Sequence, residues 1–210
     1  MHWSCLVISH EPGDVEKLLA PYDENLAIEQ YRDGGDKTYW RNPQGKWDWW
    51  AIGGRYPRRF IPLDPDEPSL VGSVKHTWQW DDKPEDWPGN VRWPTCDQIR
   101  KGNIDWESMG RRQLERAKRR WDEVQAKGVQ AIDNYLYGIN LDTNEVEYLR
   151  SAVQFTTYSA LTPDGCWHAK ETWSEEDGNY IPNDQWGLDL ARIIREAGDD
   201  DWFSMIDCHS

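Results

Sequence analysis

The chain has 210 residues, of which 38% are hydrophobic, and a formal net charge of -14. That length suits one domain, and the 15 tryptophans supply buried area that the few aliphatic residues do not, so the composition excludes wholesale disorder. With 38 acidic against 24 basic residues, direct binding of duplex DNA is not expected, because phosphate contacts need clustered Lys and Arg. The balance allows a basic protein partner, and it also fits a soluble cytoplasmic protein that simply has an acidic surface.

The sequence gives no sign of a membrane span or of a secretory leader. No stretch approaches the roughly 18 consecutive apolar residues of a membrane helix, and no basic region followed by an apolar run opens the chain. The four cysteines are widely spaced and form no CxxC motif. We therefore expect a cytoplasmic protein with free thiols and no membrane partner.

The first part of the chain predicts a β-α-β unit. Residues 3–10 are apolar and β-prone, and residues 14–20 form an amphipathic helix for which Asp14 is a suitable N-cap. Pro21 ends that helix, and residues 26–31 predict a second strand.

The middle of the chain predicts an irregular excursion followed by a long helix. Residues 57–94 carry seven of the 12 prolines together with four tryptophans, and leave room for a short edge strand within 71–80. Residues 105–127 show a helical apolar stripe that Asp105 can cap. Residues 100–127 hold nine basic against five acidic residues, so we expect this helix to dock on acidic surface.

The last part of the chain predicts further strands and one helix. Residues 135–148 fit a hairpin around an Asp-Thr-Asn turn. Residues 153–161 and 166–170 fit a second hairpin around a Thr-Pro-Asp-Gly turn. Residues 183–197 have a helical apolar face capped by Asn183, and residues 202–208 predict a final strand.

Together these elements predict an α+β fold. The expected architecture is a ferredoxin-like antiparallel or mixed sheet with two helices on one face. We expect a single domain whose core comprises residues 1–56 and 129–210. Residues 57–128 would be a large insertion that joins the Trp/Pro-rich segment to the basic helix.

The segment from Asn42 to Arg59 concentrates the unusual residues of the chain. An extended backbone through Lys46–Trp50 would place Trp47 and Trp49 on one side, and Lys46, Asp48 and Trp50 on the other. The glycine pair that follows permits positive φ. It is not part of a phosphate loop, because the motifs GxxxxGK[ST] and GxGxxG are both absent. Tryptophan faces beside guanidinium groups suit a nucleotide. The candidate ligand-binding residues are Lys46, Trp47, Asp48, Trp49, Trp50, Gly53, Gly54, Arg55 and Arg58.

A structural role for the same segment stays open. Tryptophans at alternate positions also fill protein cores, and Asp48 could simply bind a backbone amide or pair with Arg55.

Three segments of the chain carry a resemblance to a known family. They are Leu19–Leu26, the pattern NPxxKWDW/YxxGGR over residues 42–55, and Asp207–His209. The chain resembles a family of uncharacterised phage and prophage proteins, largely actinobacterial. It departs from that family at its start, where His2-Trp3-Ser4 replaces a Ser-His-Phe type of strand. The resemblance implies a phage accessory protein in the host cell cytoplasm, with no established activity.

Cysteine and histidine residues suggest two other candidate sites, a zinc site and a Cys-His nucleophile. Cys166 and His168 could join Cys208 and His209 around zinc, but adjacent ligands suit a tetrahedral ion poorly, so no metal and no cofactor is expected. A Cys-His nucleophile lacks any group that would orient the base. The remaining histidines, for which the sequence indicates no partner, are His2, His10 and His76.

Four acidic runs lie close to tryptophans in the sequence. Such carboxylates could imitate phosphates toward a nucleic-acid-binding protein, although acidic runs are also common in solvated turns. The runs are Asp81-Asp82, Glu85-Asp86, Glu175–Asp177 and Asp199–Asp201.

Three functions follow as hypotheses. The favoured one is a non-catalytic phage-type protein that counters a host defence by binding a basic, nucleic-acid-handling protein. The second is a binding protein, or sponge, for a nucleotide or signalling molecule at the Trp/Gly/Arg motif. The third is an enzyme acting on nucleotide or RNA ends, with Asp48 and either His168 or His209 as acid and base. The sequence does not indicate an oligomeric state.

Overall fold

The structure is a computed structural model, and its chain forms two compact units. One comprises residues 1–104 with 157–210, and the other comprises residues 105–156. The described residues are 1–26, 31–32, 38–39, 42, 44–56, 59–64, 66, 95–174 and 178–210.

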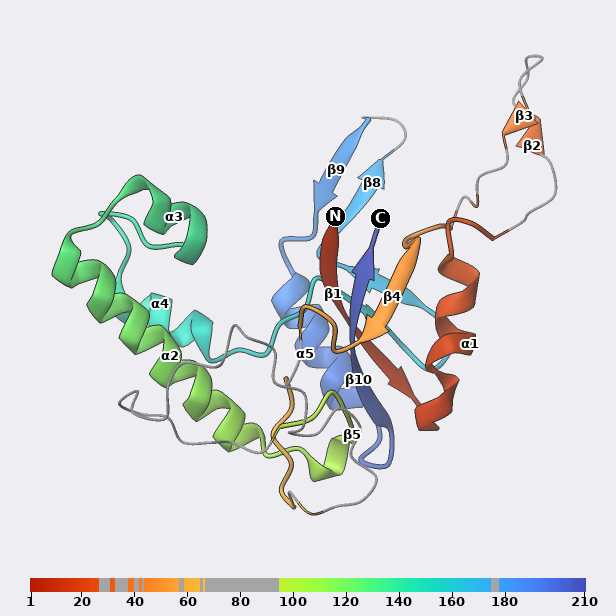
Figure 1. The fold of residues 1–210 in the computed structure, drawn as a ribbon, viewed down its shortest axis with the longest axis horizontal. Coiled ribbons are helices and arrows are strands. Elements are labelled where there is room, and N and C mark those ends of the chain that lie inside the picture. The colour runs from red at the N-terminus through yellow and green to blue at the C-terminus, as the bar shows by residue number, and fades with distance from the viewer. Residues whose placement is uncertain are drawn as a thin grey trace. The chain divides into compact units, whose positions relative to one another are not determined.

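A six-stranded mixed sheet organises the first unit (Figure 1), which confirms the predicted α+β class. The strand order is β4-β10-β1-β6-β7, and β5 also pairs with β10. β1 and β10 are antiparallel along their full length, whereas β1 and β6 are parallel. The strands are β1 (His2–Ser9), β4 (Trp49–Ile52), β5 (Gln98–Arg100), β6 (Ser159–Leu161), β7 (Trp167–Ala169) and β10 (Trp202–His209).

One face of the sheet is covered by α1 (Val15–Leu19), which two short 3-10 helices flank. Val15 and Leu19 pack against a cluster of buried strand residues on this face. Burying these apolar side chains is the main stabilising contribution there. The strand residues of the cluster are Cys5, Val7, Leu161, Ile206 and Cys208.

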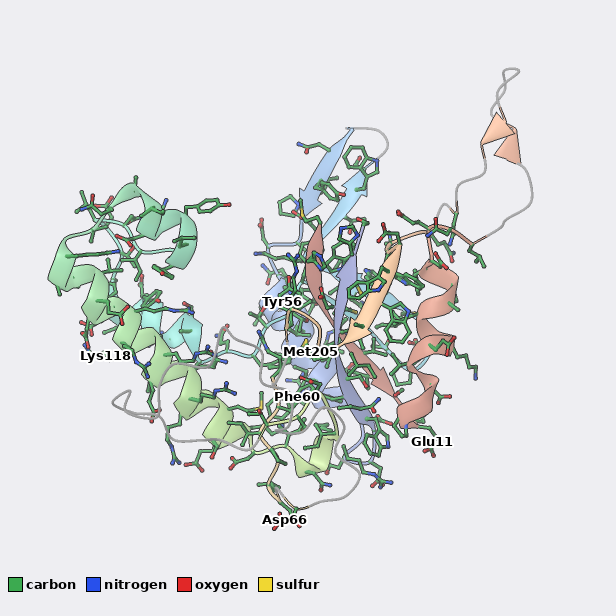
Figure 2. All side chains as sticks on the ribbon, in the orientation of Figure 1. Glu11, Tyr56, Phe60, Asp66, Lys118 and Met205 are labelled. Carbon is green, nitrogen blue, oxygen red and sulfur yellow. The ribbon has the colours of Figure 1, made fainter. Side chains whose placement is uncertain are left out.

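The opposite face is covered by α5 (Trp186–Glu196), which corrects the prediction of two helices on one face. His168 of β7 pairs with Ala160 and lies within electrostatic range of Asp189 on α5. Ala160 in turn pairs with Leu6, whose side chain points away from the α1 face. Since Cys5, Leu6, Val7 and Ile8 are all fully buried, β1 needs cover on both faces. In the same layer, Phe60 and Met205 are fully buried (Figure 2), and the Phe60 and Phe203 rings are 6.4 Å apart.

Two small hairpins lie outside the main sheet. They are formed by β2 (Tyr31–Arg32) with β3 (Thr38–Tyr39), and by β8 (Glu171–Ser174) with β9 (Asn179–Pro182). The strand predicted at 26–31 falls mostly on residues outside the described ranges. The same holds for the edge strand predicted within 71–80 and for most of the excursion predicted at 57–94.

The second unit consists of three helices: α2 (Trp106–Lys127), α3 (Ala131–Tyr137) and α4 (Glu145–Ala152). The prediction of α2 is confirmed, and the Asp105 carboxylate accepts from the Ser108 amide at 2.9 Å. The hairpin predicted at 135–148 is wrong, because α3 and α4 occupy this segment. Local capping decides the outcome: Gln130 and Asp133 form a capping box for α3, and Asn144 caps α4.

The remaining predicted elements differ mainly at their boundaries. Only β6, the last part of the predicted strand 153–161, pairs in the sheet. Its predicted hairpin with the following strand is confirmed, because β6 pairs with β7 in antiparallel register. α5 begins at Trp186, and Asn183 accepts from the Gln185 amide in the preceding turn. Among the helices of the described residues, none is long and apolar enough to cross a membrane.

Candidate functional site

The first half of the Trp/Gly/Arg motif is hydrogen-bonded to the end of α1 and the turn that follows it. The Asn42 side-chain amide donates to the carbonyls of Pro21 and Asp23, each at 2.8 Å. The indole N–H of Trp47 donates to the Leu19 carbonyl at 3.2 Å. The first half of the Trp/Gly/Arg motif is therefore an anchor to the chain that follows α1.

The tryptophans of the motif have different roles. Trp47 is buried, with 8% of its surface exposed, and belongs to the core beneath α1, against which Trp50 also packs. Trp49 points to the opposite face and is 49% exposed. The prediction that Trp47 and Trp49 share a side is wrong, because the strand begins only at Trp49. The structural alternative thus holds for Trp47, while Trp49 offers a free aromatic surface.

Gly53 and Gly54 let the chain turn closely over two buried carboxylates. Their φ angles are +74° and +49°, in the left-handed region that favours glycine. A Cβ on Gly53 would lie 2.6 Å from an oxygen of Asp97, and a Cβ on Gly54 would lie 2.4 Å from the Asp207 Cβ. Side chains at either position would therefore displace a carboxylate.

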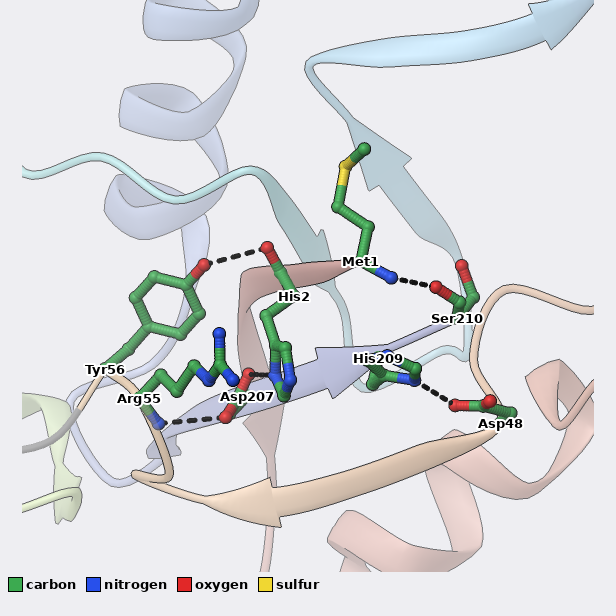
Figure 3. Close-up of polar contacts among 8 residues, drawn as sticks. All are labelled: Met1, His2, Asp48, Arg55, Tyr56, Asp207, His209 and Ser210. Carbon is green, nitrogen blue, oxygen red and sulfur yellow. Dashed lines mark hydrogen bonds and ion pairs between the residues drawn. The ribbon is translucent and has the colours of Figure 1, made fainter. Parts of the chain in front are cut away.

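Asp207 is the centre of the polar contacts at this end of the sheet (Figure 3). Its carboxylate is 1% exposed, and it accepts from the Arg55 amide at 2.8 Å and from Nδ1 of His2 at 2.9 Å. A buried carboxylate needs such donors, because an uncompensated buried charge costs about 3–5 kcal/mol. Asp207 thus fixes both the glycine turn and the His2 ring.

A second histidine–carboxylate pair lies beside the first. Nδ1 of His209 is 2.7 Å from an Asp48 carboxylate oxygen, and the Asp48 amide donates to the His209 carbonyl at 2.8 Å. The register of β1 and β10 places His2 opposite His209, with ring centroids 4.7 Å apart. The Trp49 ring is 6.1 Å from the His2 ring.

Both imidazoles are held in the same way. A carboxylate only accepts hydrogen bonds, so each neutral ring must carry its proton on Nδ1, which leaves Nε2 as an acceptor. Within the described part of the chain, neither Nε2 atom has a hydrogen-bond partner. The side chains of His2 and His209 are 22% and 37% exposed, so both rings are partly accessible to solvent.

The groups around the pairs limit the possible chemistry. The Tyr56 hydroxyl donates to the His2 carbonyl at 3.0 Å, and burial, with the nearby Asp207 charge, raises its pKa. Tyr56 therefore stays a neutral donor to the His2 carbonyl. Arg55 has an exposed side chain on the same side of β10 as His2 and Asp207 (Figure 3). The Lys46 amide donates to the Tyr22 carbonyl, and Arg58 lies outside the described residues.

The alternative zinc and cysteine sites do not assemble. Cys208 is fully buried on the α1 face, whereas His209 points to the other face. Cys166 is exposed, and its hydrogen bond to Asp164 raises the pKa of the thiol, which keeps it un-ionised. Across the ranges that the structure describes, no group of three or more His, Cys, Asp or Glu residues could hold a metal ion.

Sequence reasoning found part of this site. Asp48, Gly53, Gly54 and Arg55 were expected at a site, and His209 was one of two partners considered for Asp48. His2 was missed, because its partner Asp207 is 205 positions away and only the pairing of the first and last strands joins them. Comparison of the chain with protein-family models, with curated proteins and with solved structures finds no match.

Proposed function

We propose that the chain is an acid–base enzyme that acts on a phosphate ester at a nucleotide or RNA end. The observation that supports it is the pair of adjacent, partly exposed imidazoles, each held at Nδ1 by a carboxylate and each without a hydrogen-bond partner at Nε2 among the described residues. The enzyme hypothesis pairs Asp48 with His168 or His209, and Asp48 lies 2.7 Å from Nδ1 of His209.

The two histidines offer one base and one acid. A neutral imidazole accepts a proton at Nε2 from the attacking hydroxyl or water, and a protonated one returns a proton to the leaving oxygen. Asp48 and Asp207 orient the rings and stabilise the imidazolium that forms. Because the ring centroids are only 4.7 Å apart, one phosphate ester can reach both rings.

The neighbouring side chains support a nucleotide as the substrate. Trp49 has about half of its surface exposed beside the histidines, and a base can stack on such a ring. The exposed Arg55 guanidinium can pair with phosphate oxygens. The backbone amide of Arg55 donates to the Asp207 carboxylate, so the backbone that carries this side chain is fixed in place.

A turnover screen with a matched control tests the proposal. Nucleotides and short oligoribonucleotides with terminal phosphates are incubated with the wild type, His209→Ala and His10→Ala. His10 also binds a carboxylate, Asp201, at 2.8 Å, but it lies at the other end of β1. We expect His209→Ala to lower the rate about 10²–10⁴-fold, and His10→Ala to leave it unchanged. Equal rates for all three proteins would refute the assignment of the site.

A second candidate is the phage-type accessory role, in which the chain counters a host defence by binding a basic protein in the host cytoplasm. The net charge of -14 favours it, and exposed carboxylates such as Asp199 and Asp200, with side chains 85% and 100% exposed, provide the surface. Titration against nucleic-acid-handling host proteins at rising salt is the test. Binding should weaken as salt rises, and affinity that is indifferent to salt would exclude this mode.

A further inference from the structure

The ladder between β1 and β10 directs the carbonyl of His2 away from β10. Met1 and Ser210 exchange hydrogen bonds, with the Met1 ammonium donating to the Ser210 carbonyl and the Ser210 amide donating to the Met1 carbonyl at 3.1 Å. In an antiparallel ladder, such a pair alternates with pairs whose amides and carbonyls point outward. His2 and His209 form the next pair, so the His2 carbonyl needs a partner from outside this ladder.

The strand on the other side of β1 does not supply this partner. β6 pairs with β1 from Cys5 onward, and the Tyr158 amide just before β6 donates to the Ser4 carbonyl at 3.0 Å. The His2 carbonyl instead accepts from the Tyr56 hydroxyl at 3.0 Å (Figure 3). Burial raises the pKa of Tyr56, so the hydroxyl keeps its proton at neutral pH. A side chain thus provides the hydrogen bond that a neighbouring backbone provides further along β1.

Tyr56 belongs to the same glycine turn that binds Asp207. Its amide donates to the Gly53 carbonyl at 2.8 Å, and the adjacent Arg55 amide donates to the Asp207 carboxylate at 2.8 Å. That carboxylate also binds Nδ1 of His2. The turn therefore holds His2 at two points, at the ring through Asp207 and at the main chain through Tyr56.

We propose that Tyr56 is a positioning residue for the His2 imidazole in the acid–base reaction. The hydrogen bond at Nδ1 orients the ring, whereas the position of the ring depends on the backbone from which it projects. The Tyr56 hydroxyl fixes that backbone, so the His2 ring stays beside the His209 ring, with 4.7 Å between their centroids. A displacement of about 1 Å at a reacting group can lower a rate about 10²-fold. This proposal rests on the proposed acid–base function, because Tyr56 acts only through His2.

Tyr56→Phe removes the hydroxyl and keeps the ring, and Tyr22→Phe is its matched control. The Tyr22 hydroxyl also donates to a backbone carbonyl, that of Gly165, at 2.6 Å, and lies in the same unit. Histidine ¹⁵N NMR spectra of the full chain report the His2 ring, and turnover of oligoribonucleotides with terminal phosphates reports the reaction. We expect Tyr56→Phe to shift the His2 ring resonances and to lower kcat about 10–100-fold, with KM changed less than about twofold. Tyr22→Phe should leave the His2 resonances and kcat unchanged.

The other outcomes separate the role of Tyr56 from the function of the site. An unchanged kcat in Tyr56→Phe overturns the positioning role and leaves the acid–base function standing. A lower kcat without a shift of the His2 resonances also overturns it, because Tyr56 would then act by another route. An equal fall in kcat for Tyr22→Phe would assign the effect to a general loss of stability, which thermal unfolding followed by circular dichroism measures for both variants. Absence of turnover by the wild type overturns the proposed function, and with it any part of Tyr56 in a reaction.

Discussion

Replacing Gly54 with alanine should destabilise the fold far more than a glycine substitution normally does. A residue other than glycine at φ +49° costs about 1–2 kcal/mol. The added Cβ would lie 2.4 Å from the Asp207 Cβ and 2.5 Å from a carboxylate oxygen, so the loop must move away. That movement breaks the bond from the Arg55 amide to the carboxylate, which is worth about 1.5–3 kcal/mol. The expected total is about 2.5–5 kcal/mol.

Gly165→Ala is the matched control for this substitution. Gly165 also has a positive φ, +83°, and lies in the same unit, but an added Cβ there meets no atom within 4 Å. Its cost should be the backbone strain alone, about 1–2 kcal/mol. Urea unfolding followed by tryptophan fluorescence measures both free energies of unfolding. If Gly54→Ala costs no more than Gly165→Ala, the glycine turn does not depend on Asp207, and the description of the site is wrong.

Three further predictions concern stability and binding. Trp47→Ala should lower the free energy of unfolding by about 3–5 kcal/mol, because only 8% of the Trp47 surface is exposed. A smaller loss of stability than that caused by Trp49→Ala would contradict this. Trp49→Ala should cost less than about 1 kcal/mol yet weaken nucleotide binding in a thermal-shift titration, and unchanged binding would remove the stacking surface. The hydrogen bond from Lys127 lowers the pKa of Asp133 in the folded helical unit. The ionised Asp133 therefore stabilises the folded state at pH values above the unfolded pKa of about 3.9. This stability is lost as the pH falls through the lower, folded pKa. Asp133→Asn should flatten this acid dependence of the helical circular dichroism signal, and an unaltered profile would show that the pair contributes nothing.

Local signals in the sequence predicted the elements whose ends are marked by their own residues. α2 has Asp105 as its cap and Gly128 after its last turn, and the hairpin of β6 and β7 has a turn containing Gly165. The Asp142-Thr143-Asn144 turn suggests a hairpin over 135–148, where the structure has α3 and α4. The capping residues Gln130 and Asn144 were the overlooked signal.

The site was only partly predictable, for a physical reason. The glycine pair and Arg55 are adjacent in the sequence, so their constraint on the backbone could be read locally. His2 and His209 become neighbours only through the antiparallel register of the first and last strands. A single sequence carries no direct signal for such a pairing, and neither residue has a diagnostic neighbour. The exposure of Trp49 likewise depended on where β4 begins.

The most direct test of the central claim is a histidine ¹⁵N NMR titration of the full chain with adenosine 5′-monophosphate and inorganic phosphate. In their neutral forms, His2 and His209 should each show a protonated Nδ1 and an unprotonated Nε2. Ligand should shift the Nε2 resonances of both and leave His10 unaffected. A neutral His2 or His209 ring with its proton on Nε2, or shifts confined to His10, would contradict an acid–base site built from the two histidine–carboxylate pairs.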